Sequence, residues 1–379
     1  MTETQPADVR GPEARPVVAA LPRYSSASSA PTVRWKASSN ESTVPPSPEI
    51  VAAIAAAAST AHLYPSLLGD ALVADLAERL GVGTDQVVVG GGSIALLQQT
   101  LSAYTGHGTE VVYGWRSYEA YPILIGIAGA TGVPVPLDAG AVHDLDALRA
   151  AITPDTRVVL VCNPNNPTGT EVTPDALVRF LEQVPSNVLV VLDEAYREFA
   201  QHDTDGVELQ RRFPNVVVFR TFSKAYGLAG LRAGYLIAAP AIADNIRAAS
   251  PPFGLSAVAE AAARAALRDT DYTARIIDVV RTGREHLRSG LAALGVATPE
   301  SGANFVWIPV GERALELEAA CVARGVSVRA FAGQGVRVTV GAREAEDAVL
   351  AAVADLTPPL GASDPTDLHS SSHEKATSR

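Results

Sequence analysis

Short apolar, β-branched runs alternate with alanine-rich stretches over the first two thirds of the chain, and this alternation restricts the fold more than any other feature. The runs lie at residues 86–89, 110–113, 157–161, 188–192 and 216–219, and helical stretches at 71–80, 94–104 and 174–183 separate most of them. Continuous apolar strands that alternate with helices are typical of a mostly parallel sheet with helices on both faces. The predicted fold class is therefore α/β.

A polar motif accompanies the carboxyl end of each of the five predicted strands. In chain order the motifs are GGGS (90–93), GWRSY (114–118), NPNNPTG (163–169), DEAY (193–196) and TFSK (221–224). Open parallel sheets bind ligands beyond the carboxyl ends of their strands. We therefore expect the five motifs to meet at one edge of the sheet.

The pattern changes after about residue 269 and at both ends of the chain. A long Arg/Ala-rich helix is followed by ANFVWIPV, RGVSVRAF and GVRVTV, which are typical of strands in a smaller α+β domain. Both ends are rich in Pro, Ser, Thr, Asp and Glu, which favours disorder. The predicted parts are a disordered extension (1–20), an arm that joins the small domain (21–45), a large domain (46–268), a small domain (269–357) and a disordered tail (358–379).

Composition argues against several classes of partner. The chain has 379 residues, 47% of them apolar, and a net charge of -11, so no basic surface for nucleic acid is expected. The longest apolar run, Ile50 to Ala58, is far shorter than the ~18 residues of a membrane helix, and the polar start lacks a signal-peptide core. The two cysteines, Cys162 and Cys321, have no metal-ligand or disulfide spacing. We expect a cytoplasmic protein without a metal.

Lysine is scarce, and one of the three lysines lies in a glycine-rich apolar motif. Lys+Arg is 30, yet lysine occurs only at Lys36, Lys224 and Lys375. Arginine stays protonated, whereas a lysine can supply the neutral amine that forms an imine with an aldehyde. Lys224 is therefore a candidate catalytic residue, and the alternative is an ordinary solvated lysine in a surface loop.

Two of the motifs contain groups that bind phosphate. Thr221, Ser223 and Arg232 surround the lysine with hydroxyls and a guanidinium, which can hold a phosphate dianion. Gly92 and Ser93 end the GGGS motif where a helix is expected to begin, and the free N–H groups of a helix N-terminus favour anions. The GGGS motif alone is a weak signal, because it matches neither GK[ST] nor a full GxGxxG.

A carboxylate and three polar side chains can bind an aromatic cofactor ring. Asp193 ends an apolar strand, where burial requires a partner such as a protonated pyridine nitrogen. Tyr196 and Asn166 can hydrogen-bond a phenolic oxygen of the ring, and Tyr118 can stack on it. The alternatives are a helix cap for Asp193, a rigid turn for NPNNPTG and a core aromatic for Tyr118.

Near the carboxyl end, Arg337 lies in the alternating strand GVRVTV. Its planar guanidinium suits bidentate binding of a substrate carboxylate. The alternative is an exposed arginine on a half-buried sheet.

Together these segments resemble the class I/II aminotransferases of fold type I, and most closely their histidinol-phosphate aminotransferase branch. The similarity runs from about residue 21 to residue 356. It includes LPRY, SSNES, LYPSLLGDAL, GGGS, CNPNNPTG, DEAY, TFSKAYGLAGLRAGY, ANFVW and VRVTVG in this order. Such a combination of motifs is highly specific.

The resemblance implies a pyridoxal 5'-phosphate (PLP) cofactor carried by Lys224 as a Schiff base. It assigns Asp193 to the pyridine nitrogen, Asn166 and Tyr196 to the phenolic oxygen, and Tyr118 to the ring face. The positions that match cofactor phosphate contacts are Gly92, Ser93, Thr221, Ser223 and Arg232, and Ile94 is a further cofactor-binding position. Those that match substrate contacts are Arg337, Asn166, Tyr24 and Asn40.

The resemblance also implies a homodimer with shared sites. Tyr64 matches a tyrosine that in this family reaches the cofactor phosphate of the neighbouring subunit. The expected partners are thus a second copy of the chain and small amino acid and 2-oxo acid substrates.

Two departures from the histidinol-phosphate pattern bear on the substrate. Ile94 stands where many of those enzymes have an acidic residue, and Arg116-Ser117-Tyr118 replaces their Pro-Thr-Tyr. GWRSY and GGGSIALLQQ are similar to the aromatic-amino-acid (phenylalanine) aminotransferases of the branch. An aromatic amino acid is therefore the expected donor, with an arylpyruvate or 2-oxoglutarate as acceptor, and histidinol phosphate is the alternative. The rivals are an amino-acid phosphate decarboxylase and a non-catalytic PLP- or dinucleotide-binding module.

Overall fold

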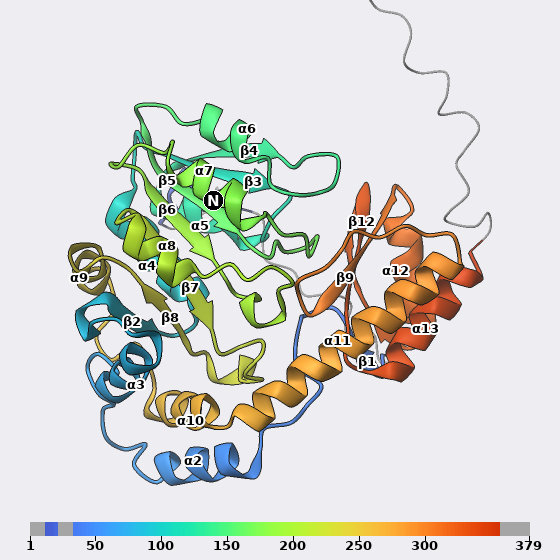
Figure 1. Cartoon of the computed structure of the whole chain (residues 1–379), viewed down its shortest axis with the longest axis horizontal. Coiled ribbons are helices and arrows are strands. Elements are labelled where there is room, and N and C mark those ends of the chain that lie inside the picture. The colour runs from blue at the N-terminus through green and yellow to red at the C-terminus, as the bar shows by residue number, and fades with distance from the viewer. Residues whose placement is uncertain (1–11, 22–32, 357–379) are drawn as a thin grey trace, which may run out of the picture.

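A seven-stranded sheet forms the centre of the larger lobe in the computed structural model, which describes residues 12–21 and 33–356 (Figure 1). In spatial order the strands are β2 (Val87–Gly90), β8 (Gly234–Ile237), β7 (Val216–Thr221), β6 (Leu189–Asp193), β5 (Thr156–Cys162), β3 (Glu110–Trp115) and β4 (Thr131–Pro136). Strand β8 is antiparallel to both neighbours, whereas the other pairs are parallel. The sheet is thus mostly parallel, as predicted.

Helices cover both faces of this sheet, which explains why its strands are apolar without interruption. Alternate strand residues enter two separate apolar cores, one with Val190 and Val218 and the other with Val191 and Val217. The first core receives α3 (Asp70–Leu80), α6 (Leu145–Ala150), α7 (Pro174–Leu181) and α8 (Gly206–Arg212). The second receives α4 (Ser93–Tyr104), α5 (Ala120–Ala128) and α9 (Pro240–Ala248).

The smaller lobe contains an antiparallel sheet in the order β11-β12-β9. Its strands are β9 (Phe305–Gly311), β11 (Arg329–Phe331) and β12 (Gln334–Thr339), packed with α12 (Ala314–Ala323) and α13 (Arg343–Ala354). A parallel pair, β1 (Trp35–Lys36) with β10 (Val326–Ser327), attaches the N-terminal segment to this lobe. The long helix α11 (Thr270–Ala293) leads into it from α10 (Ala257–Arg268), beside which α2 (Pro48–Ala58) lies (Figure 1).

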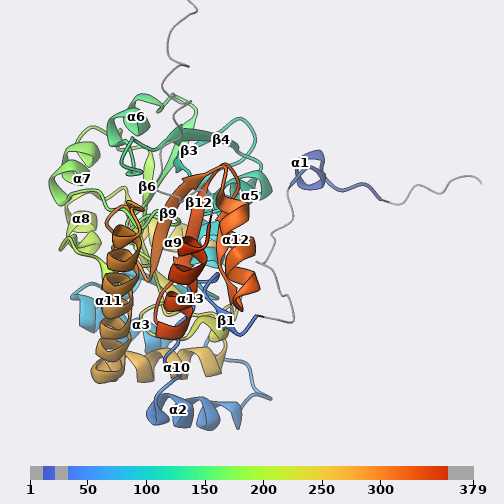
Figure 2. The ribbon, with the colours of Figure 1, turned by 90° about the vertical axis from the view of Figure 1, so that its right-hand side faces the viewer.

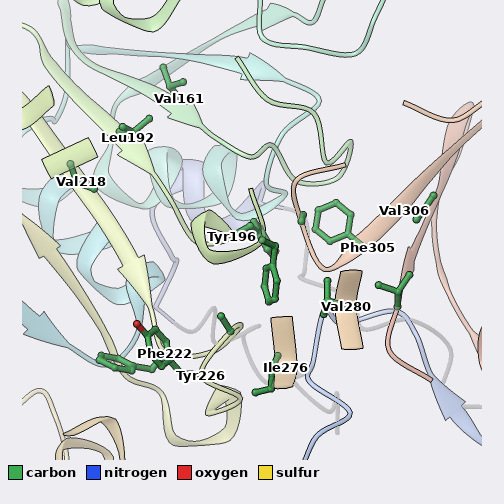
Figure 3. Close-up of a cluster of buried hydrophobic side chains, with 14 of the residues drawn as sticks. Val161, Leu192, Tyr196, Val218, Phe222, Tyr226, Ile276, Val280, Phe305 and Val306 are labelled. Atoms are coloured by element: carbon green, nitrogen blue, oxygen red, sulfur yellow. The ribbon is translucent and has the colours of Figure 1, made fainter. Parts of the chain in front are cut away.

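One apolar cluster continues from the large sheet into the smaller lobe. Tyr196, just after β6, meets Phe305 of β9 edge to face, with ring centroids 5.2 Å apart. Ile276 and Val280 of α11 belong to the same cluster (Figure 3). The two lobes therefore share packing at the place where the strand-end motifs gather.

The segment before residue 21 includes one short helix. Residues 16–19 form α1 (Pro16–Ala19), seen apart from the sheets in Figure 2. Arg15 Nη2 donates to the carbonyl of Ile127 in α5 at 2.7 Å, and proline is favoured in a first helical turn.

Candidate active site

A cavity of about 340 Å³ lies at the carboxyl ends of the parallel strands, beside the smaller lobe. The predicted site residues that line it are Asn40, Ser93, Ile94, Tyr118, Asn166, Asp193, Tyr196, Thr221, Ser223, Lys224, Arg232 and Arg337. Gly92 lies next to the side chain of Arg232, which lines the cavity. Tyr64 is 84% exposed and is not part of its wall, and Tyr24 lies outside the described residues.

The amine of Lys224 lies in this cavity just beyond β7. Its Nζ donates to the carbonyl oxygen of Asn40 at 3.1 Å and lies 5.8 Å from the ring centroid of Tyr196. Burial lowers the pKa of Lys224 to about 7, and the positive charges of Arg337 and Arg232 act in the same direction. A substantial fraction of this amine is therefore neutral near pH 7 and able to act as a nucleophile or a base.

Asp193 ends β6 with its carboxylate buried at the cavity wall. Tyr121 Oη donates to its Oδ2 at 2.7 Å, and the N–H of Ala195 donates to its Oδ1 at 3.2 Å. Burial raises the pKa of Asp193, while the Tyr121 hydroxyl opposes that shift. Both hydrogen bonds come from neutral donors, so this carboxylate is suited to a cationic partner in the cavity.

Arg232 and the start of α4 form an anion-binding corner. Arg232 Nη1 donates to Ser223 Oγ at 3.3 Å. Gly92 has a φ of 93°, which side-chain-bearing residues rarely adopt, and a Cβ atom there would come within 2.8 Å of Arg232 Nη2. Helix α4 begins at Ser93 with no side-chain cap and no acidic residue in its first turn. Its N–H groups and the guanidinium therefore suit a phosphate.

Arg337 lies on the opposite side of the cavity, on β12. It donates from Nη1 to Asn166 Oδ1 at 2.5 Å and from Nη2 to the carbonyl of Ser38 at 2.6 Å. The guanidinium carbon is 5.5 Å from the ring centroid of Phe305. These contacts hold the planar group in one orientation at the cavity wall, which suits recognition of a carboxylate.

Asn40 joins the N-terminal segment to both lobes. Its Nδ2 donates to Tyr196 Oη at 2.9 Å, and its backbone N–H donates to Thr339 Oγ1 at 2.9 Å. Its carbonyl accepts from Asn304 Nδ2 as well as from Lys224. A φ of 54° aims these groups in different directions, a conformation that asparagine adopts more readily than most residues.

Sequence reasoning missed several residues in or behind the cavity wall, among them Tyr121, Glu119 and Arg329. Tyr121 donates a hydrogen bond to Asp193. The sequence feature that could have indicated it is a second tyrosine three residues after Tyr118, in the first turn of α5. Glu119 and Arg329 line the wall and form an ion pair at 2.9 Å. No local pattern indicates that pair, because 210 residues separate its members.

The site thus combines an amine that titrates near neutrality, a buried carboxylate, an anion-binding corner and a fixed arginine. The chain belongs to the class I and II aminotransferases, because the sequence model of that family matches residues 35–354. The predicted family, fold class and PLP cofactor are confirmed.

Among curated relatives, this chain is similar to two Streptomyces proteins named aromatic amino acid aminotransferase. The one from Streptomyces coelicolor is 51% identical, with 84% of this chain and 89% of the relative covered. The one from Streptomyces avermitilis is 48% identical, with 89% and 96% covered. These relatives confirm the predicted similarity to the aromatic amino acid aminotransferases.

Among solved structures, a histidinol-phosphate aminotransferase from Sinorhizobium meliloti in complex with PLP has a TM-score of 0.79 and 31% identity. The match covers 85% of this chain and 90% of that one. A Thermus thermophilus aspartate aminotransferase mutant, at 21% identity and a TM-score of 0.77, shares the fold.

None of the helices in residues 12–21 and 33–356 combines the length and the apolarity needed to cross a bilayer.

Proposed function

We propose that the protein moves an amino group between aromatic amino acids and 2-oxo acids, with PLP as cofactor. The observation that carries the proposal is that one cavity holds the Lys224 amine, with its pKa lowered to about 7, together with Asp193 and Arg337. The aromatic substrate class is supported by the names of the relatives at 48–51% identity.

The residues present fit PLP. Its phosphate suits Arg232, Ser223 and the start of α4, and its ring nitrogen suits the buried Asp193, whose hydrogen bonds from Tyr121 and Ala195 come from neutral donors. When bound, the cofactor supplies an aldehyde for imine formation and an electron-accepting ring.

The side chains of the chain perform the acid–base and binding work. Lys224 accepts and returns a proton at Nζ, because a pKa near 7 allows both states at neutral pH. Asp193 stabilises positive charge on the ring nitrogen through its carboxylate. Arg337, fixed by Asn166 and Ser38, orients the substrate carboxylate.

Histidinol phosphate is the second candidate substrate, and a second arginine in the cavity wall favours it. Arg329 lines the same cavity as Arg337, so a second cation is present for a phosphate group. The relative from Sinorhizobium meliloti carries that substrate in its name.

A homodimer with shared sites is the proposed assembly. Tyr64 is 84% exposed and stacks on Phe253 at 4.7 Å between ring centroids. Leu63, Leu67 and Leu68 are exposed beside it, which is typical of a surface that a partner subunit covers. Tyr64 is thereby available to the neighbouring subunit's cofactor phosphate. The cytoplasmic location and the absence of nucleic acid partners stay predictions.

A half-reaction assay tests the proposal. The PLP form is mixed with phenylalanine, tyrosine, glutamate or histidinol phosphate, and the change in cofactor absorbance is followed. Phenylalanine or tyrosine is expected to exceed histidinol phosphate in kcat/KM by at least about tenfold, which is 1.4 kcal/mol in the transition state. A preference for histidinol phosphate would replace the aromatic proposal, and release of CO2 in place of a 2-oxo acid would indicate a decarboxylase.

A further inference from the structure

The wall of the cavity on the side of the smaller lobe contains an ion pair that the proposed mechanism does not use. Glu119, at the start of α5, accepts from Arg329 of β11 through both carboxylate oxygens, at 2.9 and 3.1 Å from Nη2 and 3.3 Å from Nε. Both residues line the cavity, and their side chains are only 16% (Arg329) and 27% (Glu119) exposed. This geometry is the bidentate form that an arginine also uses for a phosphate or carboxylate ligand.

Without Glu119 this wall would carry a dense positive charge. Arg329 lies directly opposite Arg337 in the β11–β12 register, so the two arginines share one face of the sheet. The ring of Phe331 lies 5.4, 5.9 and 6.0 Å from the guanidinium carbons of Arg116, Arg329 and Arg337. Like charges on adjacent strands repel, and a nearby carboxylate relieves that repulsion.

The pKa of Arg116 reflects the same charge cluster. Burial lowers it, Glu119 acts to raise it, and Arg329 lowers it further. Arg116 has its own contacts with the Trp115 ring and with Gln334 Oε1, whereas Arg329 has the Glu119 carboxylate.

We propose that Glu119 determines substrate specificity by occupying Arg329, so that the site favours substrates whose only anionic group is one α-carboxylate over substrates that carry more negative charge. This inference rests on the proposed aminotransferase function. A substrate with a phosphate must displace Glu119 from Arg329 and then lie beside the released carboxylate, which costs Coulomb energy. An uncharged aromatic side chain requires no such exchange.

The discrimination increases with the anionic charge that a substrate brings to the cavity. Histidinol phosphate carries a phosphate of about -1.5 to -2 charges near pH 7 in place of the α-carboxylate, glutamate carries a second carboxylate in its side chain, and phenylalanine carries the α-carboxylate alone. Removal of the Glu119 charge therefore favours histidinol phosphate most, glutamate less and phenylalanine least.

The test measures kcat/KM for histidinol phosphate, glutamate and phenylalanine with the PLP-loaded enzyme. Glu119→Gln keeps the size of the side chain and removes its charge, and it is expected to raise the ratio of histidinol phosphate to phenylalanine roughly tenfold. Glu119→Ala must shift the ratio in the same direction. The double variant Glu119→Gln/Arg329→Gln is expected to lose the gain, because the released guanidinium is then absent.

Glu300→Gln is the matched control. Glu300 also accepts two hydrogen bonds from one arginine, Arg288, at 2.6 and 2.7 Å, but it does not line the cavity. In the Glu300→Gln variant, the kcat/KM ratio of histidinol phosphate to phenylalanine should equal that of the unsubstituted enzyme. An unsubstituted enzyme that prefers phenylalanine, with a ratio unmoved in both Glu119 variants, would overturn this inference alone. An unsubstituted enzyme that prefers histidinol phosphate would overturn the aromatic proposal and this inference together.

Discussion

Two neighbouring carboxylates at the end of β6 occupy opposite environments. Glu194 faces the protein interior, where its Oε2 accepts from Arg220 Nε at 2.8 Å and its Oε1 accepts from the N–H of Gly206 at 3.0 Å. Asp193 faces the cavity and, within the described part of the chain, accepts from Tyr121 and Ala195, which are neutral donors. Burial raises the pKa of both carboxylates, but only at Glu194 does a directly bonded arginine oppose it.

The difference separates a structural acid from a functional one. The charge of Glu194 is compensated within the protein, so Glu194 contributes to folding. The charge of Asp193 is stabilised by hydrogen bonds from neutral donors at the wall of a cavity. This arrangement suits a ligand that carries a positive charge. A substitution at Asp193 should therefore lower kcat, whereas a substitution at Glu194 should lower the free energy of unfolding.

The largest effect is expected on the cavity side, at Lys224. Lys224→Ala removes the amine that binds the cofactor and moves the proton, so turnover should fall by more than about 10³-fold. Some PLP should remain bound through the phosphate corner at Arg232 and Ser223, which absorbance after desalting would show. Lys36→Ala, at an exposed position, is the control. Full turnover by Lys224→Ala would exclude Lys224 from the chemistry.

Asp193→Asn should have the next largest effect on rate and little effect on stability. The amide is nearly the same size but cannot stabilise a cationic ring nitrogen, so kcat should fall about 10²- to 10³-fold. The melting temperature should stay close to that of the unsubstituted protein, because burial already penalises the charged carboxylate. A normal kcat would make Asp193 a strand-end cap and would remove the contrast with Glu194.

Glu194→Gln should give the reverse result. The change removes the carboxylate that Arg220 bonds at 2.8 Å and leaves the buried guanidinium with the partly exposed Asp205 at 3.3 Å, which costs about 3 kcal/mol of unfolding free energy. The folded variant should retain kcat within about threefold, because Glu194 does not line the cavity. Denaturant unfolding and kcat are measured on the same preparation. A large loss of kcat without a loss of stability would show that Glu194 acts through Asp193.

The contrast between the two acids was only partly predictable from the sequence. Uninterrupted apolar strands predicted a covered parallel sheet, and the strand-end rule predicted that Asp193 and Lys224 would share one edge. The partner of each acid was not predictable, because Tyr121 and Arg220 reach them from other elements. Local patterns encode which residues share an element, whereas such contacts depend on how elements pack.

The cavity wall from the smaller lobe was the least predictable part of the site. The pairing of Arg329 with Glu119 depends on the β11–β12 register and on how that sheet lies against α5. No pattern within either segment indicates this pair, because its two members lie 210 residues apart in the chain.

The smallest expected effect concerns Tyr121, the residue that gives Asp193 one of its two neutral donors. The Tyr121 hydroxyl holds the pKa of Asp193 down against the upward shift from burial. Tyr121→Phe removes this donor, so the pKa of Asp193 rises further and more of the carboxylate is protonated at any given acidic pH. Because only the carboxylate form can stabilise a cationic ring nitrogen, the variant should lose about threefold to tenfold in kcat near neutrality. The loss should increase as the pH is lowered, since protonation removes the remaining carboxylate. Tyr104→Phe is the control, because its hydroxyl accepts from Asn245 outside the cavity. A pH-independent loss would show that the Tyr121 hydroxyl contributes packing or cofactor placement and leaves the charge of Asp193 unaffected.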